Sequence, residues 1–222
     1  FRNPTIADLA QILNQNNVVQ LRVTKQIKPQ DIPLSFAQRR LWFLYQLEGP
    51  NPTYNIPVIA KMDGEINISA LEEAISIVVK RHEILRTVFT EKNGLACQVI
   101  LEPAQLKSML TVTNVTEEEL EEALKSAARY SFDLKNEPSI RFHLFNLNSE
   151  KHVLLILLHH IAGDGSSLPV LMNELAIAYE SNLYDLECIL PSLIVQYADY
   201  TLWQEDFLGN ETDENSVIRK QS

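Results

Sequence analysis

The chain has 222 residues, and 45% of them are hydrophobic, which is enough to bury the core of one ordinary domain or of two small ones. Its 29 acidic and 19 basic side chains give a formal net charge of −10, which disfavours a nucleic acid or an anionic membrane as partner because both require a basic face. No apolar run approaches the roughly 20 residues that cross a bilayer, and no signal core opens the chain, so we expect a cytoplasmic protein.

The N-terminal segment is predicted to be separate from the rest of the chain. Residues 1–15 have the apolar spacing of a short helix, with Asn3 as N-cap and Pro4 in the first turn. Residues 16–32 are polar with few apolar anchors and are typical of a linker. The main unit is then expected over 33–222, and its polar end at 209–222 suggests a piece of a longer protein.

Helices and strands are interspersed throughout the main unit, which predicts an α/β fold with a mixed sheet and helices packed on it. Helical periodicity predicts helices at 35–48, 67–82, 116–132, 167–181 and 194–209. Strands are predicted at 54–64, 85–91, 95–101, 109–115, 140–147 and 152–158. The last of these shows no polar alternation, so we expect a central strand that is covered on both faces. Cys97 and Cys188 have no metal-like spacing and are expected to be free thiols.

The sequence HVLLILLHHIAGDGSS at 152–167 holds the candidate chemistry. His159 and His160 end the apolar strand, and because neighbouring strand residues point to opposite faces, only one imidazole can enter a given cleft. Gly163 and Gly165 allow a tight turn after them. Asp164 lies in this turn, where it either orients an imidazole or pairs with an arginine.

Three arginines are candidates for that pairing with Asp164, namely Arg81, Arg86 and Arg141. The histidines have no third ligand at zinc spacing, so no metal site is expected. A G-x-S-x-G elbow and a phosphate-binding loop are also missing from the sequence. What remains is a histidine that acts on a nucleophile brought by the substrate.

Four stretches together resemble the condensation domain of nonribosomal peptide synthetases, within the chloramphenicol-acetyltransferase-like acyltransferases. They are LSFAQRRLWFLYQL at 34–47, RHEILRTVF at 81–89, LHHIAGDGSS at 158–167 and YADYTLWQ at 197–204. The resemblance implies that residues 33–222 form the N-terminal of two similar lobes. Residues 1–15 likewise resemble the last helix of an upstream carrier-protein domain.

The resemblance also implies a function: peptide-bond formation between a donor thioester and the amine of an acceptor aminoacyl thioester. It places His160, Asp164 and Gly165 in the site, with His160 as the catalytic histidine, Asp164 shaping the loop and Gly165 offering its N–H to the oxyanion. His159, Arg81 and Arg86 are motif residues with structural roles. Relatives often carry a bulky residue where this chain has Ser166.

No cofactor is expected to bind the domain itself, because both substrates arrive on phosphopantetheine arms. The implied partners are the upstream and downstream carrier-protein domains, the C-terminal lobe and the adjacent synthetase domains. Half of a condensation domain is expected to be inactive alone. Two alternatives remain open: a non-catalytic docking module of the same fold, and an epimerising relative that acts on an α-proton. The direct junction of carrier tail and linker favours an L-configured donor.

Overall fold

The structure is a computed structural model that describes residues 22–106 and 108–209. The helix expected at 1–15 lies outside the described residues, as does the first part of the expected linker. No helix in the described part of the chain is long and apolar enough to cross a membrane.

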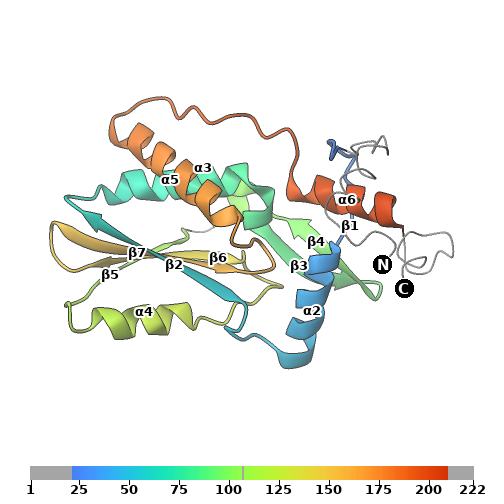
Figure 1. The fold of residues 1–222 in the computed structure, drawn as a ribbon, viewed down its shortest axis with the longest axis horizontal. Coiled ribbons are helices and arrows are strands. Elements are labelled where there is room, and N and C mark those ends of the chain that lie inside the picture. The colour runs from blue at the N-terminus through green and yellow to red at the C-terminus, as the bar shows by residue number, and fades with distance from the viewer. Residues whose placement is uncertain (1–21, 107, 210–222) are drawn as a thin grey trace, which may run out of the picture.

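A four-stranded sheet of order β2-β7-β6-β5 forms the centre of the fold (Figure 1). Its strands are β2 (Asn55–Asp63), β7 (Lys151–His159), β6 (Ile140–Asn146) and β5 (Leu110–Asn114). β7 is antiparallel to β2 and to β6, whereas β5 and β6 are parallel, so the sheet is mixed as predicted.

Both faces of β7 are covered, as the unbroken apolar run predicts. Leu154, Ile156 and Leu158 belong to the large core, to which α3 (Ile68–Arg81) and α5 (Ser167–Leu183) also contribute. On the opposite face, Val153 and Leu155 pack with the apolar side of α4 (Leu120–Ala128). Figure 1 shows the layers, with α3 and α5 above the sheet and α4 below it. The strand that ends at the two histidines is therefore a rigid, buried element.

A second, three-stranded sheet of order β1-β4-β3 was not distinguished from the first in the sequence. It consists of β1 (Ile32–Pro33), β4 (Leu95–Ile100) and β3 (Thr87–Lys92), all antiparallel. The short 3-10 helix η1 (Glu83–Arg86) connects α3 to β3, and η2 (Pro103–Gln105) follows β4. α2 (Phe36–Glu48) and α6 (Tyr197–Leu208) lie near this sheet (Figure 1).

The described end of the expected linker is in contact with this region. Ile32 already pairs with Gln98 of β4, and the backbone N–H of Gln26 donates to Asp199 of α6 at 2.8 Å. Lys28 forms an ion pair with Glu83 of η1. Residues 26–32 are thus attached to the lobe by contacts that polarity alone does not predict.

The starts of α2 and α3 follow the capping chemistry of the sequence, whereas α4 and α6 begin later than expected. Ser35 caps α2 through a reciprocal capping box with Gln38, and Asn67 caps α3. The acidic helix expected from Thr116 begins at Leu120 instead. Thr116 and Glu119 exchange hydrogen bonds there, around a turn that precedes the helix. Cys97 and Cys188 are both free thiols, as expected.

Candidate active site

His159 and His160 diverge at the end of β7. His159 is buried, with 4% of its surface exposed, and its ring packs edge-on to Phe132 with centroids 6.0 Å apart. Its Nδ1 accepts the backbone N–H of Ile161 at 3.1 Å. Burial away from water, with a smaller effect from His160, lowers the pKa of His159 to about 4. His159 is therefore a neutral packing residue at physiological pH.

His160 is exposed and lines a cavity of about 730 Å³. Its backbone is fixed, since its N–H donates to the carbonyl of Tyr54 at 2.8 Å, just before β2. The same cavity is walled by residues of α2, η1, the loop after β7, and the first turns of α5 and α6, among them Gln38, Arg40, Ile84, Ala162, Val170 and Tyr197. Only one histidine of the pair faces the cleft, as the strand alternation predicts.

Asp164 bonds to the turn that leads into α5 rather than to an arginine. Its Oδ1 accepts the backbone N–H of Ser166 at 2.9 Å and of Ser167 at 3.2 Å, and both serine hydroxyls donate to the same oxygen. These bonds, above all that from the Ser166 hydroxyl, lower the pKa of Asp164. The N–H groups of the N-cap residue Ser166 and of the first helical residue Ser167 thus find an acceptor in the loop that follows His160.

The three arginines proposed as partners of Asp164 bind elsewhere, so that expectation is wrong for the described residues. Arg81 donates from Nε to Glu174 at 3.0 Å, and Arg141 donates to Glu137 at 3.1 Å while stacking on a tyrosine ring. Arg86 donates to the carbonyls of Leu101 and Lys80. Half-buried arginines need hydrogen-bond partners, and these three find them in acids and carbonyls outside the loop that holds Asp164.

The two glycines of the loop differ in what they require. A Cβ on Gly163 would lie 2.8 Å from Cδ2 of Leu158 and 3.2 Å from Oγ of Ser167, so close approach requires glycine there. A Cβ on Gly165 would meet nothing within 4 Å. Gly165 is exposed and is not among the residues that line the cavity. Packing within the protein therefore requires glycine at 163 and leaves room for a Cβ at 165.

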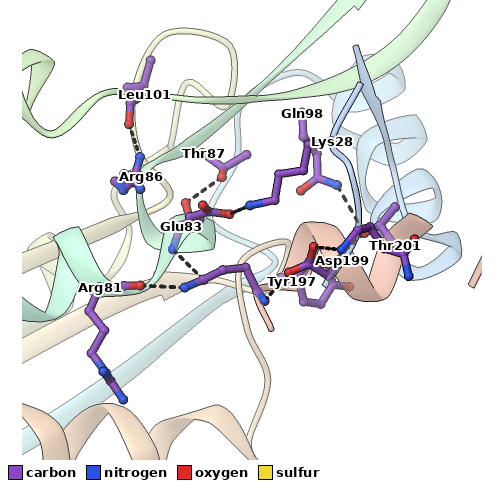
Figure 2. A network of polar contacts seen from close by, with 12 residues as sticks. Lys28, Arg81, Glu83, Arg86, Thr87, Gln98, Leu101, Tyr197, Asp199 and Thr201 are labelled. Atoms are coloured by element: carbon purple, nitrogen blue, oxygen red, sulfur yellow. Dashed lines mark hydrogen bonds and ion pairs between the residues drawn. The ribbon is translucent and has the colours of Figure 1, made fainter. Parts of the chain in front are cut away.

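A polar network joins the motif at 81–89 to the start of α6 (Figure 2). Gln196 accepts the backbone N–H of Glu83 at 3.1 Å and donates to the carbonyl of Arg81 at 2.9 Å. Figure 2 shows that the guanidinium of Arg81 points away from this network. Next to Gln196, Tyr197 reaches the cavity, and its Oη is 2.8 Å from Oγ of Ser35. The network thus fixes two walls of the cavity relative to each other.

Sequence reasoning missed two residues that the structure brings to the site. His82 lines the cavity, and Glu174 binds it from α5. His82 lies within the RHEILRTVF motif, where only the arginines were singled out as candidates. Glu174 gave no signal, since one glutamate in a helix is most often a solvated residue.

The fold and the cavity define a mixed α/β lobe with one histidine presented at the end of a buried strand. A family model for the condensation domain matches residues 28–216. The chain is 47% identical over 221 residues to a dimodular nonribosomal peptide synthase of Bacillus subtilis (strain 168), a match that covers all of this chain and 9% of that protein. An isonitrile lipopeptide synthase of Mycobacterium tuberculosis is 42% identical over 197 residues, covering 87% of this chain and 8% of that protein.

Solved structures agree with this assignment. The X-domain in complex with OxyB from teicoplanin biosynthesis superposes with a TM-score of 0.82 at 31% identity, over 90% of this chain and 43% of that one. The first condensation domain of the calcium-dependent antibiotic synthetase, in complex with a substrate analogue, superposes at 0.73 over 82% and 45%. Its identity of 19% supports the fold alone. The chain belongs to the condensation-domain family, and it spans less than half the length of these structures.

Proposed function

We propose that this chain is the N-terminal lobe of a condensation domain that joins two carrier-bound substrates through a peptide bond, with His160 as the catalytic histidine. The observation that carries the proposal is the divergence of the pair: His160 lines the cavity of about 730 Å³, whereas His159 is buried in the core. A side chain at the end of a rigid strand is held in a fixed position for chemistry.

The reaction needs no group from the protein beyond an acid–base side chain and an oxyanion donor. The amine nitrogen of the acceptor bonds to the carbonyl carbon of the donor thioester, the carbon–sulfur bond breaks, and sulfur leaves as a thiol that takes the proton lost by nitrogen. An α-amine with a pKa of about 8 is partly neutral at physiological pH, so a strong base is not required. We assign His160 to positioning of the amine and to late removal of its proton.

The loop after His160 supplies the second element of the site. Asp164, Ser166 and Ser167 form the cavity wall at the N-terminal end of α5, where the helix dipole is positive. Asp164 keeps this turn in shape through its hydrogen bonds to Ser166 and Ser167. The backbone N–H of Gly165 remains the proposed donor to the developing oxyanion. Gly165 does not itself line the cavity of this chain, so this role requires the substrate to reach the outer side of the turn between Asp164 and Ser166.

The proposal includes the remaining half of the domain. The cavity would be completed by a C-terminal lobe, so we expect the single lobe to be inactive. Donor and acceptor would reach His160 on phosphopantetheine arms of the upstream and downstream carrier-protein domains. Residues 1–15, 16–32 and 33–222 are proposed as a carrier-protein tail, a linker and the lobe, and a cytoplasmic location remains a prediction from sequence.

A second candidate function is a non-catalytic docking module. It is favoured by the likeness to the X-domain, a structure described as a complex with another protein, OxyB. In that case His160 would be dispensable and the lobe would act through its surface. The two functions make opposite predictions for a change at His160.

The test is a dipeptide-forming assay with the complete domain and both loaded carrier proteins. His160→Ala is expected to suppress product by a factor of about 100 or more, the usual range for loss of an acid–base group, without unfolding the domain. His159→Asn, which keeps an acceptor near Nδ1, serves as the matched control and should retain most of the activity at neutral pH. Equal activity of wild type and His160→Ala would favour the docking function.

Donor stereochemistry is tested in the same assay. Matched L- and D-aminoacyl donors are loaded on the upstream carrier protein, and the L-donor is expected to give more product. A preference for the D-donor would overturn the stereochemical proposal alone. Absence of product from either donor would count against the enzymatic function.

A further inference from the structure

His82 is a second histidine on the wall of the cavity that holds His160. It is the C-cap residue of α3 and precedes η1, so it enters the cavity from a different element than the strand-end histidine. Its imidazole keeps 19% of the side-chain surface exposed. Nothing in the proposed mechanism uses it.

A buried carboxylate fixes the orientation of this imidazole. Oε2 of Glu174 lies 2.6 Å from Nε2 of His82 and 3.0 Å from Nε of Arg81. Only 9% of the Glu174 side chain is exposed. A second nitrogen of the Arg81 guanidinium, Nη2, donates to the carbonyl of Pro191. The three side chains form a continuous polar chain from the surface to the cavity wall.

The chemistry of this chain determines the tautomer of His82. A carboxylate oxygen can only accept, so Nε2 of His82 must carry the proton in this contact. In neutral imidazole the other nitrogen, Nδ1, is then an acceptor. Among the described residues, no hydrogen bond to Nδ1 of His82 is found. In its neutral form, the ring is therefore oriented by Glu174 and has one uncommitted acceptor, Nδ1.

Burying such a cluster has a cost that simple packing would avoid. Desolvation of a buried ion pair offsets much of its attraction, and apolar side chains of similar size often stabilise a protein as well or better. A carboxylate that holds a histidine in one tautomer is a recurrent way to prepare that ring for a ligand. Here the prepared ring belongs to the cavity that His160 lines.

We propose that His82 is a substrate-binding residue of this cavity, whose Nδ1 accepts a hydrogen bond from an N–H group of a carrier-bound substrate. Glu174 and Arg81 are its positioning residues. The inference rests on the proposed function, since it takes the ligand to be an aminoacyl or pantetheine chain, both of which contain N–H donors. The competing role is a purely structural link between the end of α3 and α5.

Two substitutions separate these roles, because each preserves one ring nitrogen. The carboxamide of glutamine can place its NH₂ near the former Nε2, so His82→Gln keeps the bond to Glu174 and loses the Nδ1 acceptor. Asparagine can place its oxygen near the former Nδ1, so His82→Asn keeps the acceptor and loses the bond to Glu174. For both variants, KM, kcat and the melting temperature are measured in the complete domain. In the first series the loaded upstream carrier protein is the donor and an aminoacyl-pantetheine thioester is the acceptor. In the second series the pantetheine thioester is the donor and the acceptor is loaded on a carrier protein.

For His82→Gln we expect a KM raised roughly three- to tenfold for one of the two substrates, with kcat and the melting temperature near wild type. For His82→Asn we expect a lower melting temperature with a smaller change in KM. An unchanged KM for both substrates in His82→Gln, or a loss that follows the melting temperature, would overturn the proposal. Glu137→Gln is the matched control, because it alters the half-buried Arg141–Glu137 pair outside the cavity.

A second measurement keeps the inference testable if a variant folds poorly, and separates it from the proposed function. In wild-type protein with ¹⁵N-labelled histidine, a non-reactive pantetheine thioether of an aminoacyl group is titrated in. The Nδ1 resonance of His82 should shift on binding, whether or not peptide forms. A shift without product would contradict only the proposed reaction. If peptide forms but neither an aminoacyl nor a peptidyl thioether shifts the Nδ1 resonance of His82, only the role of His82 is contradicted.

Discussion

The backbone N–H of Ile161 donates to Nδ1 of His159 at 3.1 Å, so this buried imidazole serves as the acceptor that ends β7. The bond requires an unprotonated Nδ1. Protonation would place a buried positive charge at the end of an apolar strand.

The first prediction is a loss of stability between about pH 6.5 and pH 4. The pKa of His159 is about 4 in the folded protein and about 6.5 when unfolded, so the unfolded state binds more protons in this window. Stability therefore rises with pH, by up to about 3 kcal/mol from this group. Urea unfolding of the complete domain at several pH values measures the slope.

His159→Asn is the control for that slope, since it retains an acceptor for Ile161 but does not titrate. Burial also lowers the pKa of His143, and this contribution persists in the variant. The difference between wild type and variant isolates His159. Parallel stability curves from pH 4 to pH 7 would show that His159 is not buried in the neutral form.

The second prediction concerns Asp164, whose carboxylate accepts the N–H groups of Ser166 and Ser167 as a helix cap does. Asp164→Ala should destabilise the domain by about 1 kcal/mol, whereas Asp164→Asn should cost only a few tenths because asparagine caps helices about equally well. The lowered pKa of Asp164 implies a contribution that is present above its unfolded pKa and lost as pH falls through the folded value. Chemical denaturation of both variants is the measurement. Comparable losses in both would point to a charge partner beyond the described residues.

The sequence predicted the fold where local pattern is sufficient. The apolar run at 152–158 indicated a doubly covered strand, and its end correctly separated His159 from His160. Contacts between distant segments were not predictable in the same way. Arg81 was one of three candidate partners of Asp164, but the acid that it contacts is Glu174. Glu174 lies on a helix whose periodicity does not show which polar residue meets a partner. The division into two sheets likewise depends on strand pairing that no local pattern specifies.

The third prediction separates the two glycines after the histidines. Gly163→Ala should destabilise the domain by about 1–3 kcal/mol, because its Cβ would overlap the buried side chain of Leu158. Gly165→Ala should leave stability within about 0.5 kcal/mol, since the added methyl faces open space. Both are compared by urea unfolding, with activity measured in parallel. A larger loss of stability for Gly165→Ala than for Gly163→Ala would contradict the loop geometry.

The fourth prediction concerns the attachment to α6 of the segment around Gln26, which the sequence predicts to be a linker. Asp199 is 1% exposed, and its two oxygens accept the backbone N–H groups of Gln26 at 2.8 Å and Gln196 at 2.7 Å. Asp199→Asn preserves the shape but turns an NH₂ group toward one of these donors. We therefore expect a loss of about 1–3 kcal/mol, the cost of leaving a buried polar group without a partner.

Asp206→Asn on the same helix is the matched control, because Asp206 is exposed and should tolerate the change within about 0.5 kcal/mol. Limited proteolysis then shows whether the linker is released, since detachment of Gln26 should make residues 22–31 a preferred cleavage site in Asp199→Asn and not in Asp206→Asn. Because Gln196 also bonds to Glu83 and Arg81 beside the cavity, the same variant should lower peptide-forming activity. Unchanged stability together with an uncleaved linker would show that the bond from Gln26 to Asp199 does not hold the segment on the lobe.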